Sequence, residues 1–289
     1  MIDMDGKQME IMEKIHRVQL KLLIEFDRLC RKYKIKYYIA AGTLLGAVRH
    51  KDFIPWDDDI DIYLKRKDYK AFLAHAHEFK YPFEVHVPTP RDDFFWDYTT
   101  RLVYKESKLK FNDEENAFYH HQNNEYLFLD IFVLDKTYSG IRNAIQLGKL
   151  KMIYGMAMSR RYTINYSDYP SFFSKSQVFI LSHIGKLFRM ATLYNAYERE
   201  SVRYNNAPKA KYEQPTNITV KFLGTLFYKC AWHQRVVELE IRKHKFLAPK
   251  EYKKILKTVY GDYMCLPPED KRKPEHIGVL DEIQIEEKM

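Results

Sequence analysis

Three aspartates alternate along one short segment of the sequence. Asp57, Asp59 and Asp61 are each separated by one residue, within Trp56-Asp57-Asp58-Asp59-Ile60-Asp61. Side chains two residues apart in an extended chain share a face, so these three should converge while Asp58 points away. Two carboxylates about 4 Å apart repel by roughly 4 kcal/mol at an effective dielectric constant of about 20. The segment therefore predicts a site for a hard cation such as Mg²⁺ or Mn²⁺, against the alternative of an acidic surface loop.

A fourth aspartate, Asp130, lies inside the apolar run Leu127–Leu134. An isolated ionised carboxylate is costly to bury, so Asp130 should have a partner. A metal ion shared with Asp59 and Asp61 would be one; the alternatives are a helix cap or a salt bridge to an arginine. Asp135, at the end of the run, is predicted to be a turn residue.

A Gly-Thr turn precedes the aspartates. Gly42-Thr43 follows a short apolar run and precedes Leu44-Leu45-Gly46-Ala47-Val48-Arg49-His50. Such a turn from strand to helix can hold phosphate through free backbone N–H groups and the helix dipole, whereas the plainer interpretation makes Thr43 a helix N-cap. Arg49 and His50 are candidates for phosphate contact or proton transfer, and His50 is equally well explained as a surface residue.

Hydrophobic periodicity predicts the elements that hold these residues. Apolar positions spaced by three and four residues indicate a helix over residues 9–33, and a second helix is expected over 65–79. Strands are predicted at residues 37–40, 59–64, 83–87, 98–104 and 127–135, the last buried on both faces. After Gly140 the spacing becomes mostly helical. We therefore predict an α/β (α+β) fold with a mixed sheet flanked by helices in residues 1–140 and a mostly helical region in residues 141–289.

Composition sets outer limits on partners and location. The 289 residues include 48 Lys and Arg against 39 Asp and Glu, a formal net charge of +9, which favours polyanionic partners without choosing among them. The N-terminus lacks an apolar signal region and no run of about 18 apolar residues occurs, so we expect a cytoplasmic protein. The apolar segment 172–188 could contact the inner face of the plasma membrane, the alternative being that it packs on the catalytic half.

The pattern of these motifs resembles the nucleotidyltransferase superfamily and, more closely, the LicD family. The matching segments are GTLLGAVRHKDFIPWDDDIDIYL (42–64), YLFLDIFVLD (126–135) and YGDYMCLPPEDKRKPEH (260–276), the last through Tyr260, Gly261, Asp262, Pro267, Arg272 and His276. The resemblance covers roughly residues 20–277. It departs at Asp52, where a glycine is expected, and at Val133, where a proline is commoner. Gly42 also lies further ahead of the acidic pair than in the general superfamily.

The resemblance implies transfer of phosphocholine, or a related phospho-alcohol, from CDP-choline to a sugar hydroxyl of a teichoic acid or lipopolysaccharide precursor, which could be lipid-linked. It implies that Asp59 and Asp61 hold two divalent ions, Mg²⁺ or Mn²⁺, with Asp57 and Asp130 completing their shells. Asp130 would be the general base, with His50 as a further catalytic candidate.

The donor would be held by a second set of residues. Gly42, Thr43 and Arg49 would steady the diphosphate. A quaternary ammonium favours aromatic faces, which makes Trp56, Trp96 and Tyr98 candidates, against the alternative that they belong to the core.

Two other functions remain open on the sequence. One is a nucleotidyltransferase acting on a small molecule or RNA, although no recognised RNA-binding motif is present and we do not expect nucleic acid as a partner. The other is a non-enzymatic module that binds glycans through the Tyr- and Lys-rich C-terminal half, although the repeats common in such modules are missing.

Overall fold

A computed structural model describes residues 6–89, 95, 97–108, 126–161, 164, 166–169, 171–274 and 284–285 of the chain. Its internal contacts divide the chain into two units, each described here by itself. The first comprises Met1–His86, Thr100–Val133 and Ala231–Met289; the second comprises Val87–Thr99 and Leu134–Cys230. The division at residue 140 that the composition suggests stays a prediction.

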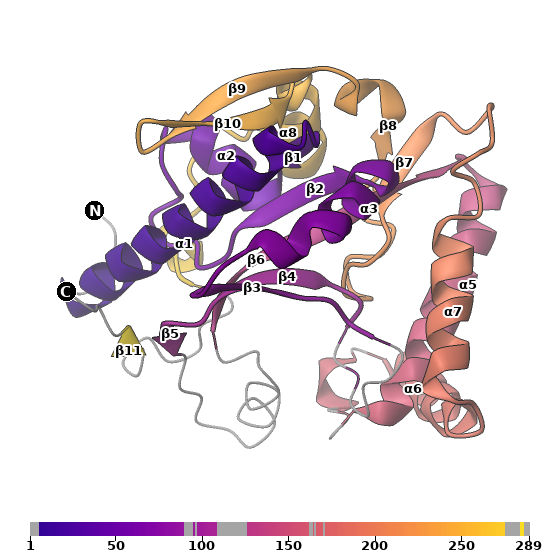
Figure 1. Cartoon of the computed structure of the whole chain (residues 1–289). Coiled ribbons are helices and arrows are strands. Elements are labelled where there is room, and N and C mark those ends of the chain that lie inside the picture. Colours follow the sequence, from indigo (N-terminus) through magenta and orange to yellow (C-terminus); the bar gives the residue numbers. More distant parts are fainter. Residues whose placement is uncertain are drawn as a thin grey trace. The chain divides into compact units, whose positions relative to one another are not determined.

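The first unit begins with the long helix α1 (Gly6–Lys32) (Figure 1). The apolar spacing that predicts this helix places Ile15, Leu22, Phe26 and Leu29 in the core, where all four are fully buried. Its last turn carries Arg31 and Lys32, whose charges favour the negative end of the helix dipole. The prediction of a helix here is confirmed.

Five strands form the sheet of the first unit, in the order β1-β2-β6-β4-β3. Their bounds are β1 Tyr37–Ile39, β2 Asp61–Lys65, β3 Phe83–His86, β4 Thr100–Tyr104 and β6 Leu127–Thr137. Strand β2 pairs antiparallel with β1, where Tyr63 lies opposite Tyr38, and β4 pairs antiparallel with β6, where Arg101 lies opposite Asp130. These are the five strands that the sequence predicts, with shifted ends.

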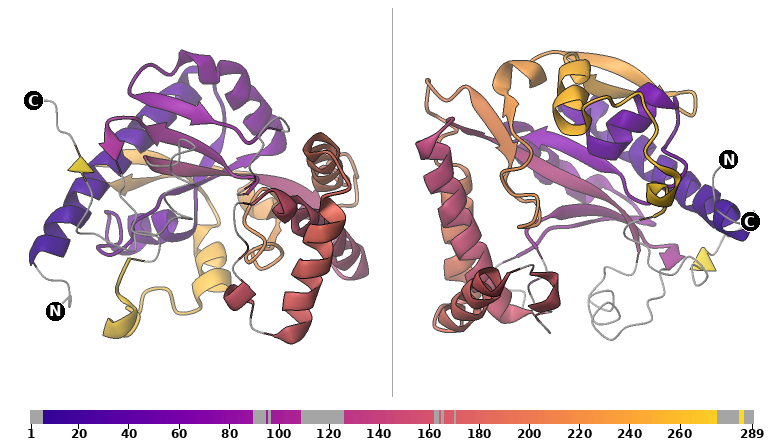
Figure 2. Two further views of the ribbon diagram at one scale, coloured as in Figure 1. Left: turned by 90° about the horizontal axis from the view of Figure 1, so that it is seen from below. Right: turned by 180° about the vertical axis from the view of Figure 1, so that it is seen from behind.

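Shorter elements surround this sheet. Helix α3 (Arg66–His75) packs against β2, while α2 (Ala41–Arg49) packs against α8 (Tyr252–Tyr260) and against strand β9 (Val236–Ile241). Strand β9 forms a hairpin with β10 (His244–Pro249), visible at the top of the right-hand view of Figure 2, and β10 lies beside β1. Its two-residue turn, Arg242-Lys243, has φ values of 48° and 68°, as a tight hairpin turn requires. The helical spacing after Gly140 does not predict this hairpin.

The second unit contains the end of β6 and three helices. These are α5 (Ile141–Ala157), α6 (Phe172–Gly185) and α7 (Met190–Ser201), and α5 packs against both of the others. Residues Leu134–Thr137 of β6 pair with β7 (Tyr212–Pro215), which pairs with β8 (Tyr228–Lys229). The mixed sheet with its helices confirms the α+β prediction, while β7 to β10 show that the C-terminal half also contains strands.

One residue prediction in this unit is wrong. Asp135 is not in a turn: β6 continues to Thr137, and the carboxylate is fully buried. It accepts hydrogen bonds from Asn205 Nδ2 and Thr216 Oγ1, each at 2.5 Å, which satisfy the buried charge.

The remaining described elements are short. Strand β5 (Ser107–Lys108) pairs with β11 (Gln284–Ile285), and single 3₁₀ turns span Ala76–Glu78, Met158–Arg160, Tyr166–Asp168, Cys230–His233 and Glu269–Lys271. No helix in the described part of the chain is long and apolar enough to cross a membrane.

Candidate active site

The acidic segment is not one straight strand. Strand β2 begins only at Asp61, and Asp57 closes a hydrogen-bonded turn by donating its N–H to the carbonyl of Ile54 at 2.9 Å. Asp57 and Asp59 precede the strand, so the prediction that one strand carries all three carboxylates is wrong, while their position on one common face stays a prediction. Asp58, which an extended segment would point away, is buried.

The backbone of Asp61 is held to the start of helix α2. Its N–H donates to Thr43 Oγ1 at 2.9 Å, and its carbonyl accepts from the N–H of Ala40 at 3.0 Å. Helix α2 begins at Ala41 with Ala40 as its N-cap, so Thr43 lies inside the first turn and the prediction that it caps the helix is wrong. Its buried hydroxyl instead fixes the first residue of β2 beside the N-terminus of α2.

Asp57 approaches that same helix end. A Cβ atom added to Gly42 would lie only 2.2 Å from Asp57 Oδ2, so the carboxylate occupies the space that a side chain at residue 42 would need. A carboxylate is favoured at a helix N-terminus, where free N–H groups and the dipole present positive charge. Gly42 is therefore required for the close approach of Asp57. The Asp57 carboxylate thus lies against Gly42, and the prediction that Gly42 and Thr43 hold phosphate stays a prediction.

Asp130 is beside the two remaining carboxylates and already has a partner. Its N–H donates to the carbonyl of Ile60, which separates Asp59 from Asp61, at 2.9 Å. Its Oδ1 lies 2.9 Å from Arg101 Nε, and both side chains are largely buried. Of the alternatives open on the sequence, the salt bridge to an arginine is the one found, so the burial of Asp130 does not by itself require a metal ion.

The electrostatic state of the site is set at Asp61. Burial raises the pKa of this carboxyl well above its usual range, and the charges of Asp59, Asp130 and Asp57 raise it further. Asp57, Asp59 and Asp130 thus all lie within electrostatic range of Asp61. No three Asp, Glu, His or Cys side chains of the described residues are arranged as a metal site. The four carboxylates therefore do not converge on a single point. The donor set itself, four carboxylates, is the chemistry that hard divalent cations prefer.

Basic and aromatic side chains lie next to the acidic group. Arg49 donates from Nη1 to the carbonyls of Tyr263 and Cys265, both at 3.3 Å, in the segment that follows α8. Burial lowers the pKa of Arg49, the nearby Tyr260 and Asp57 raise it, and Arg272 lowers it. Arg49 thus lies within electrostatic range of both Arg272 and Asp57.

The Trp56 ring lies near two basic residues, Arg272 and His50. The Arg272 guanidinium lies 6.0 Å from the centre of its ring, and His50 meets it edge to face with ring centres 6.3 Å apart. Burial and the charge of Arg49 lower the pKa of His50, while Asp52 raises it. Trp56 is therefore already engaged with a cation of the chain itself.

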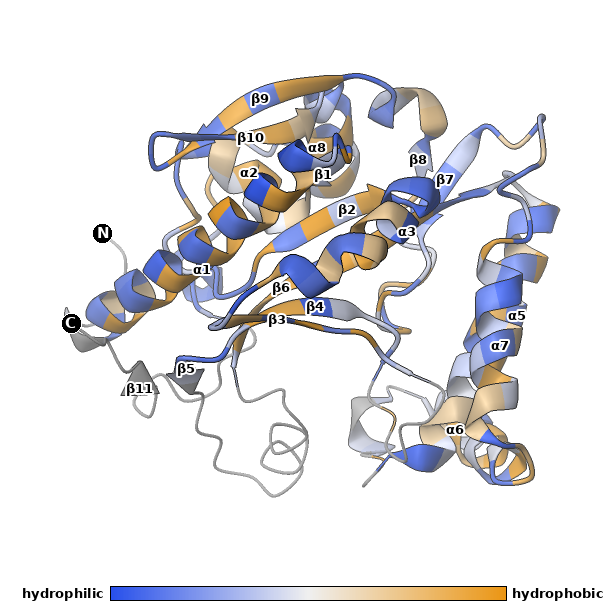
Figure 3. Cartoon of the chain, viewed as in Figure 1, coloured by the Kyte–Doolittle hydropathy of each residue, from blue (hydrophilic) through white to orange (hydrophobic). Residues whose placement is uncertain are grey.

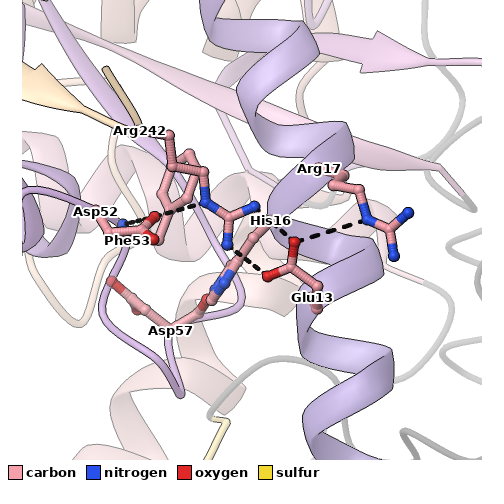
Figure 4. A network of polar contacts seen from close by, with 7 residues as sticks. All are labelled: Glu13, His16, Arg17, Asp52, Phe53, Asp57 and Arg242. Carbon is pink, nitrogen blue, oxygen red and sulfur yellow. Dashed lines mark hydrogen bonds and ion pairs between the residues drawn. The ribbon is translucent and has the colours of Figure 1, made fainter. Parts of the chain in front are cut away.

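A polar network fixes the loop between α2 and β2 (Figure 4). Arg242, at the tip of the β9–β10 hairpin, binds both carboxylate oxygens of Glu13 on α1, at 2.9 and 2.6 Å, and donates Nε to Asp52 at 2.7 Å. Asp52, at the position where the sequence resemblance predicts a glycine, anchors the loop to the hairpin in this chain.

The same network reaches Asp57. His16 on α1 stacks on Phe53 with ring centres 5.1 Å apart and donates Nε2–H to the backbone carbonyl of Asp57 at 2.9 Å. Because a carbonyl only accepts, His16 carries its proton on Nε2. The position of Asp57 therefore depends on α1 as well as on Gly42.

The other aromatic candidate described lies in the second unit. Tyr98 is 6% exposed and stacks on Tyr197 at 3.8 Å, with Tyr154 edge-on to it at 5.7 Å. Its ring is part of a core cluster, which is the alternative stated for it above. Trp96 and His276 lie outside the described residues.

Comparison with known proteins shows what this part of the chain is similar to. Residues 34–145 match the family model described as LicD/FKTN/FKRP, nucleotidyltransferase domain. The match covers this segment of the chain. All four candidate carboxylates, together with Gly42, Thr43, Arg49, His50 and Trp56, lie inside it.

Individual relatives match to different extents. The chain is 28% identical over 277 residues to the lipopolysaccharide cholinephosphotransferase LicD of Haemophilus influenzae, covering 90% of this chain and 94% of the relative. An uncharacterised protein of Rickettsia typhi is 41% identical over 78 residues, 27% of this chain and 25% of that protein. The human ribitol 5-phosphate transferase FKRP is 47% identical over 34 residues, 12% of this chain and 7% of that protein.

Three arginines of the site escape prediction from spacing. Arg101, Arg242 and Arg272 come from different elements, and only the fold brings them to the aspartates. Arg272 stands in the C-terminal segment that resembles the LicD family, which was a usable signal. Nothing local in the sequence marks Arg101 or Arg242.

Proposed function

We propose that this chain is a metal-dependent phosphotransferase that moves phosphocholine, or a related phospho-alcohol, from a CDP-linked donor to a sugar hydroxyl of a glycan precursor. The observation that carries the proposal is the group of four carboxylates, Asp57, Asp59, Asp61 and Asp130, around the buried Asp61. The match to the LicD family model and the printed name of the Haemophilus relative support the reaction class.

Asp59 and Asp61 are the residues proposed to hold one or two divalent cations, with Asp57 beside them. When bound, such ions would stabilise charge on the attacking and leaving oxygens of the displaced phosphoryl group. Asp130 would accept the proton of the sugar hydroxyl, and Arg101 would orient it for that task. Thr43 contributes indirectly, because it fixes the backbone of Asp61.

The donor diphosphate would be bound by Arg49 and Arg272 more than by the start of α2. Two guanidinium groups within electrostatic range of each other suit a diphosphate, whose charge would relieve their repulsion. The Asp57 carboxylate lies against the start of α2, so the proposed role of Gly42 is to leave room for that carboxylate by lacking a side chain. Trp56 would serve as the support on which Arg272 lies.

The identity of the transferred phospho-alcohol is a separate question. Of the three aromatic residues that could surround a quaternary ammonium, Trp56 is engaged by Arg272 and Tyr98 is buried in the second unit. The name of FKRP shows that one relative of the domain transfers ribitol 5-phosphate. A phospho-alcohol other than choline is therefore the second candidate.

The test offers four donors in parallel to the purified chain with Mn²⁺ and an amino-sugar acceptor. CMP release is measured with CDP-choline and CDP-ribitol, and pyrophosphate release is measured with CTP and ATP. Asp59→Ala and Asp61→Ala should each abolish release, while Glu240→Ala, which removes an exposed carboxylate on the β9–β10 hairpin, should not. Titration calorimetry with Mn²⁺ gives a second readout, and both aspartate variants should bind the ion more weakly.

Full activity in both aspartate variants would refute the metal assignment. Turnover of CTP or ATP without turnover of either CDP-alcohol would favour a nucleotidyltransferase instead. Release of CMP from CDP-ribitol alone would support the proposed reaction type, with ribitol phosphate as the transferred group in place of phosphocholine.

A further inference from the structure

Helix α6 has its large apolar residues on the outside. The buried positions are Val178, Ser182 and Gly185, which recur four and three residues apart on one face. A Cβ atom on Gly185 would lie 1.9 Å from the carbonyl oxygen of Met156, so the backbones of α5 and α6 are packed in close contact there. The inner face of α6 therefore consists of Val178, Ser182 and Gly185, together with Leu181, whose side chain lies against Gly155 of α5.

The opposite face is apolar and exposed. Phe173, Ile180 and Ile184 recur seven and four residues apart, on the side of the helix away from Ser182. The exposed fractions reach 87% for Phe172 and 82% for Leu187, in the turn that follows the helix. The exposed large apolar residues of this segment are Phe172, Phe173, Phe179, Ile180, Ile184, Leu187 and Phe188. Their hydropathy shows in the ribbon around α6 in Figure 3.

Charge separates this region from the rest of the chain. Residues 136–197 contain nine Lys and Arg side chains and one acidic residue, Asp168. That stretch therefore carries a formal charge of +8 out of the +9 of the whole chain. Lys175, Lys186 and Arg189, which flank the apolar residues, are all exposed.

We propose that helix α6 and the turn to Arg189, called here the α6 surface, dock the protein on a membrane that contains anionic lipids. A helix with one apolar face and basic flanks lies in the plane of a bilayer interface, with the apolar side chains in the acyl region and the basic ones at the headgroups. None of the described helices can cross a membrane, so this contact is peripheral.

A second copy of the chain fits this surface less well. A symmetric dimer would place the α6 surface against itself, and its basic side chains would face like charges with no acidic residue of the segment to pair with them. A negatively charged lipid surface complements both the apolar and the basic residues. This inference goes beyond the proposed reaction and does not depend on it.

Vesicle flotation of the full-length chain tests the proposal, with vesicles of phosphatidylcholine alone and vesicles of equal parts phosphatidylcholine and phosphatidylglycerol. The wild-type chain should float with the anionic vesicles, and high salt should weaken the association. The variant Phe172→Ser, Phe173→Ser, Leu187→Ser should lose binding by about tenfold or more. Phe222→Ser, which removes an exposed aromatic ring elsewhere in the second unit, should bind as wild type does.

A second variant tests the charges. Lys175→Gln with Lys186→Gln should weaken partitioning roughly thirtyfold, given the usual contribution of a basic side chain near an anionic surface. All variants should keep the wild-type unfolding temperature, since the replaced side chains are exposed. Absence of wild-type binding to anionic vesicles, or equal binding by the triple apolar variant, would overturn the proposal. A lipid-free dimer in sedimentation equilibrium that the triple variant abolishes would overturn it in favour of self-association.

Discussion

Replacing Gly42 by alanine should strongly reduce activity without unfolding the protein. The new Cβ would lie 2.2 Å from Asp57 Oδ2, whereas real Cβ contacts stay beyond 3.0 Å, so the carboxylate must move by at least 0.8 Å. The atom that must move is the end of a side chain, and Gly42 lies inside a helix, where alanine is favoured over glycine by up to about 1 kcal/mol. The free energy of unfolding should therefore stay within about 1 kcal/mol of wild type.

The activity should respond much more strongly. A displacement of about 1 Å at a reacting centre can cost on the order of a hundredfold in rate, and we expect kcat/KM for CMP release to fall by about that factor. The assay is CMP release with Mn²⁺, together with Mn²⁺ affinity by calorimetry, which should also weaken. Unfolding by urea, followed by circular dichroism, measures stability in parallel.

The control is Gly148→Ala in helix α5. A Cβ at this position meets nothing within 4 Å, so the change should stabilise the chain by up to about 1 kcal/mol and leave activity unchanged. A second comparison places Gly42→Ala in an Asp57→Asn background, where it should cost little more, because both changes act on the same group. Wild-type activity and Mn²⁺ affinity in a folded Gly42→Ala chain would refute the reasoning, since Asp57 would then not need its present position.

Further changes test how the site is held. Thr43→Val should lower the free energy of unfolding by about 1–3 kcal/mol, because the N–H of Asp61 loses its buried acceptor, and Thr43→Ser should restore most of it in the same urea titration. Burial and its acidic neighbours raise the pKa of Asp61, so the folded chain holds a proton that the unfolded chain releases above about pH 4. The contribution of this group to the free energy of unfolding should therefore decline as pH rises through its folded pKa. In thermal melts, Asp61→Asn should remove this decline and Mn²⁺ should offset it. An Asp61→Asn chain with the same pH dependence of stability as wild type would contradict this. Arg242→Ala should cost about 1 kcal/mol, since both partners, Glu13 and Asp52, are partly exposed, and should lower kcat more than a mere loss of stability would.

A helix or strand can be predicted from the sequence where its hydrophobic pattern is complete within one continuous segment. The apolar spacing of α1 and the unbroken apolar run of β6 each identify a buried element without knowledge of its neighbours. The strands β7 to β10 were missed because short, half-exposed strands such as Val236–Ile241, whose burial alternates weakly, lack a strong period. Their position in the fold is decided by long-range pairing.

The sequence indicates candidate carboxylates but not their geometry. Alternation indicates Asp57, Asp59 and Asp61, but it does not report that the strand begins only at Asp61 or that a hydrogen-bonded turn from Ile54 to Asp57 precedes it. The partner of Asp130 is decided by the register of β4 against β6, which places Arg101 opposite it. Register between strands more than twenty residues apart depends on the packing of the whole sheet.

These findings move the argument for a cation from Asp130 to Asp61. Asp130 has an arginine partner, so its burial is already compensated. Asp61 is buried among three other carboxylates, and its backbone is fixed on both sides, by Thr43 at the N–H and by Ala40 at the carbonyl. Because the backbone cannot carry the carboxylate away from its neighbours, only a proton or a cation can relieve the repulsion at this position. Asp61 is therefore the position at which the proposed divalent cation would have the most repulsion to relieve, by replacing a proton there.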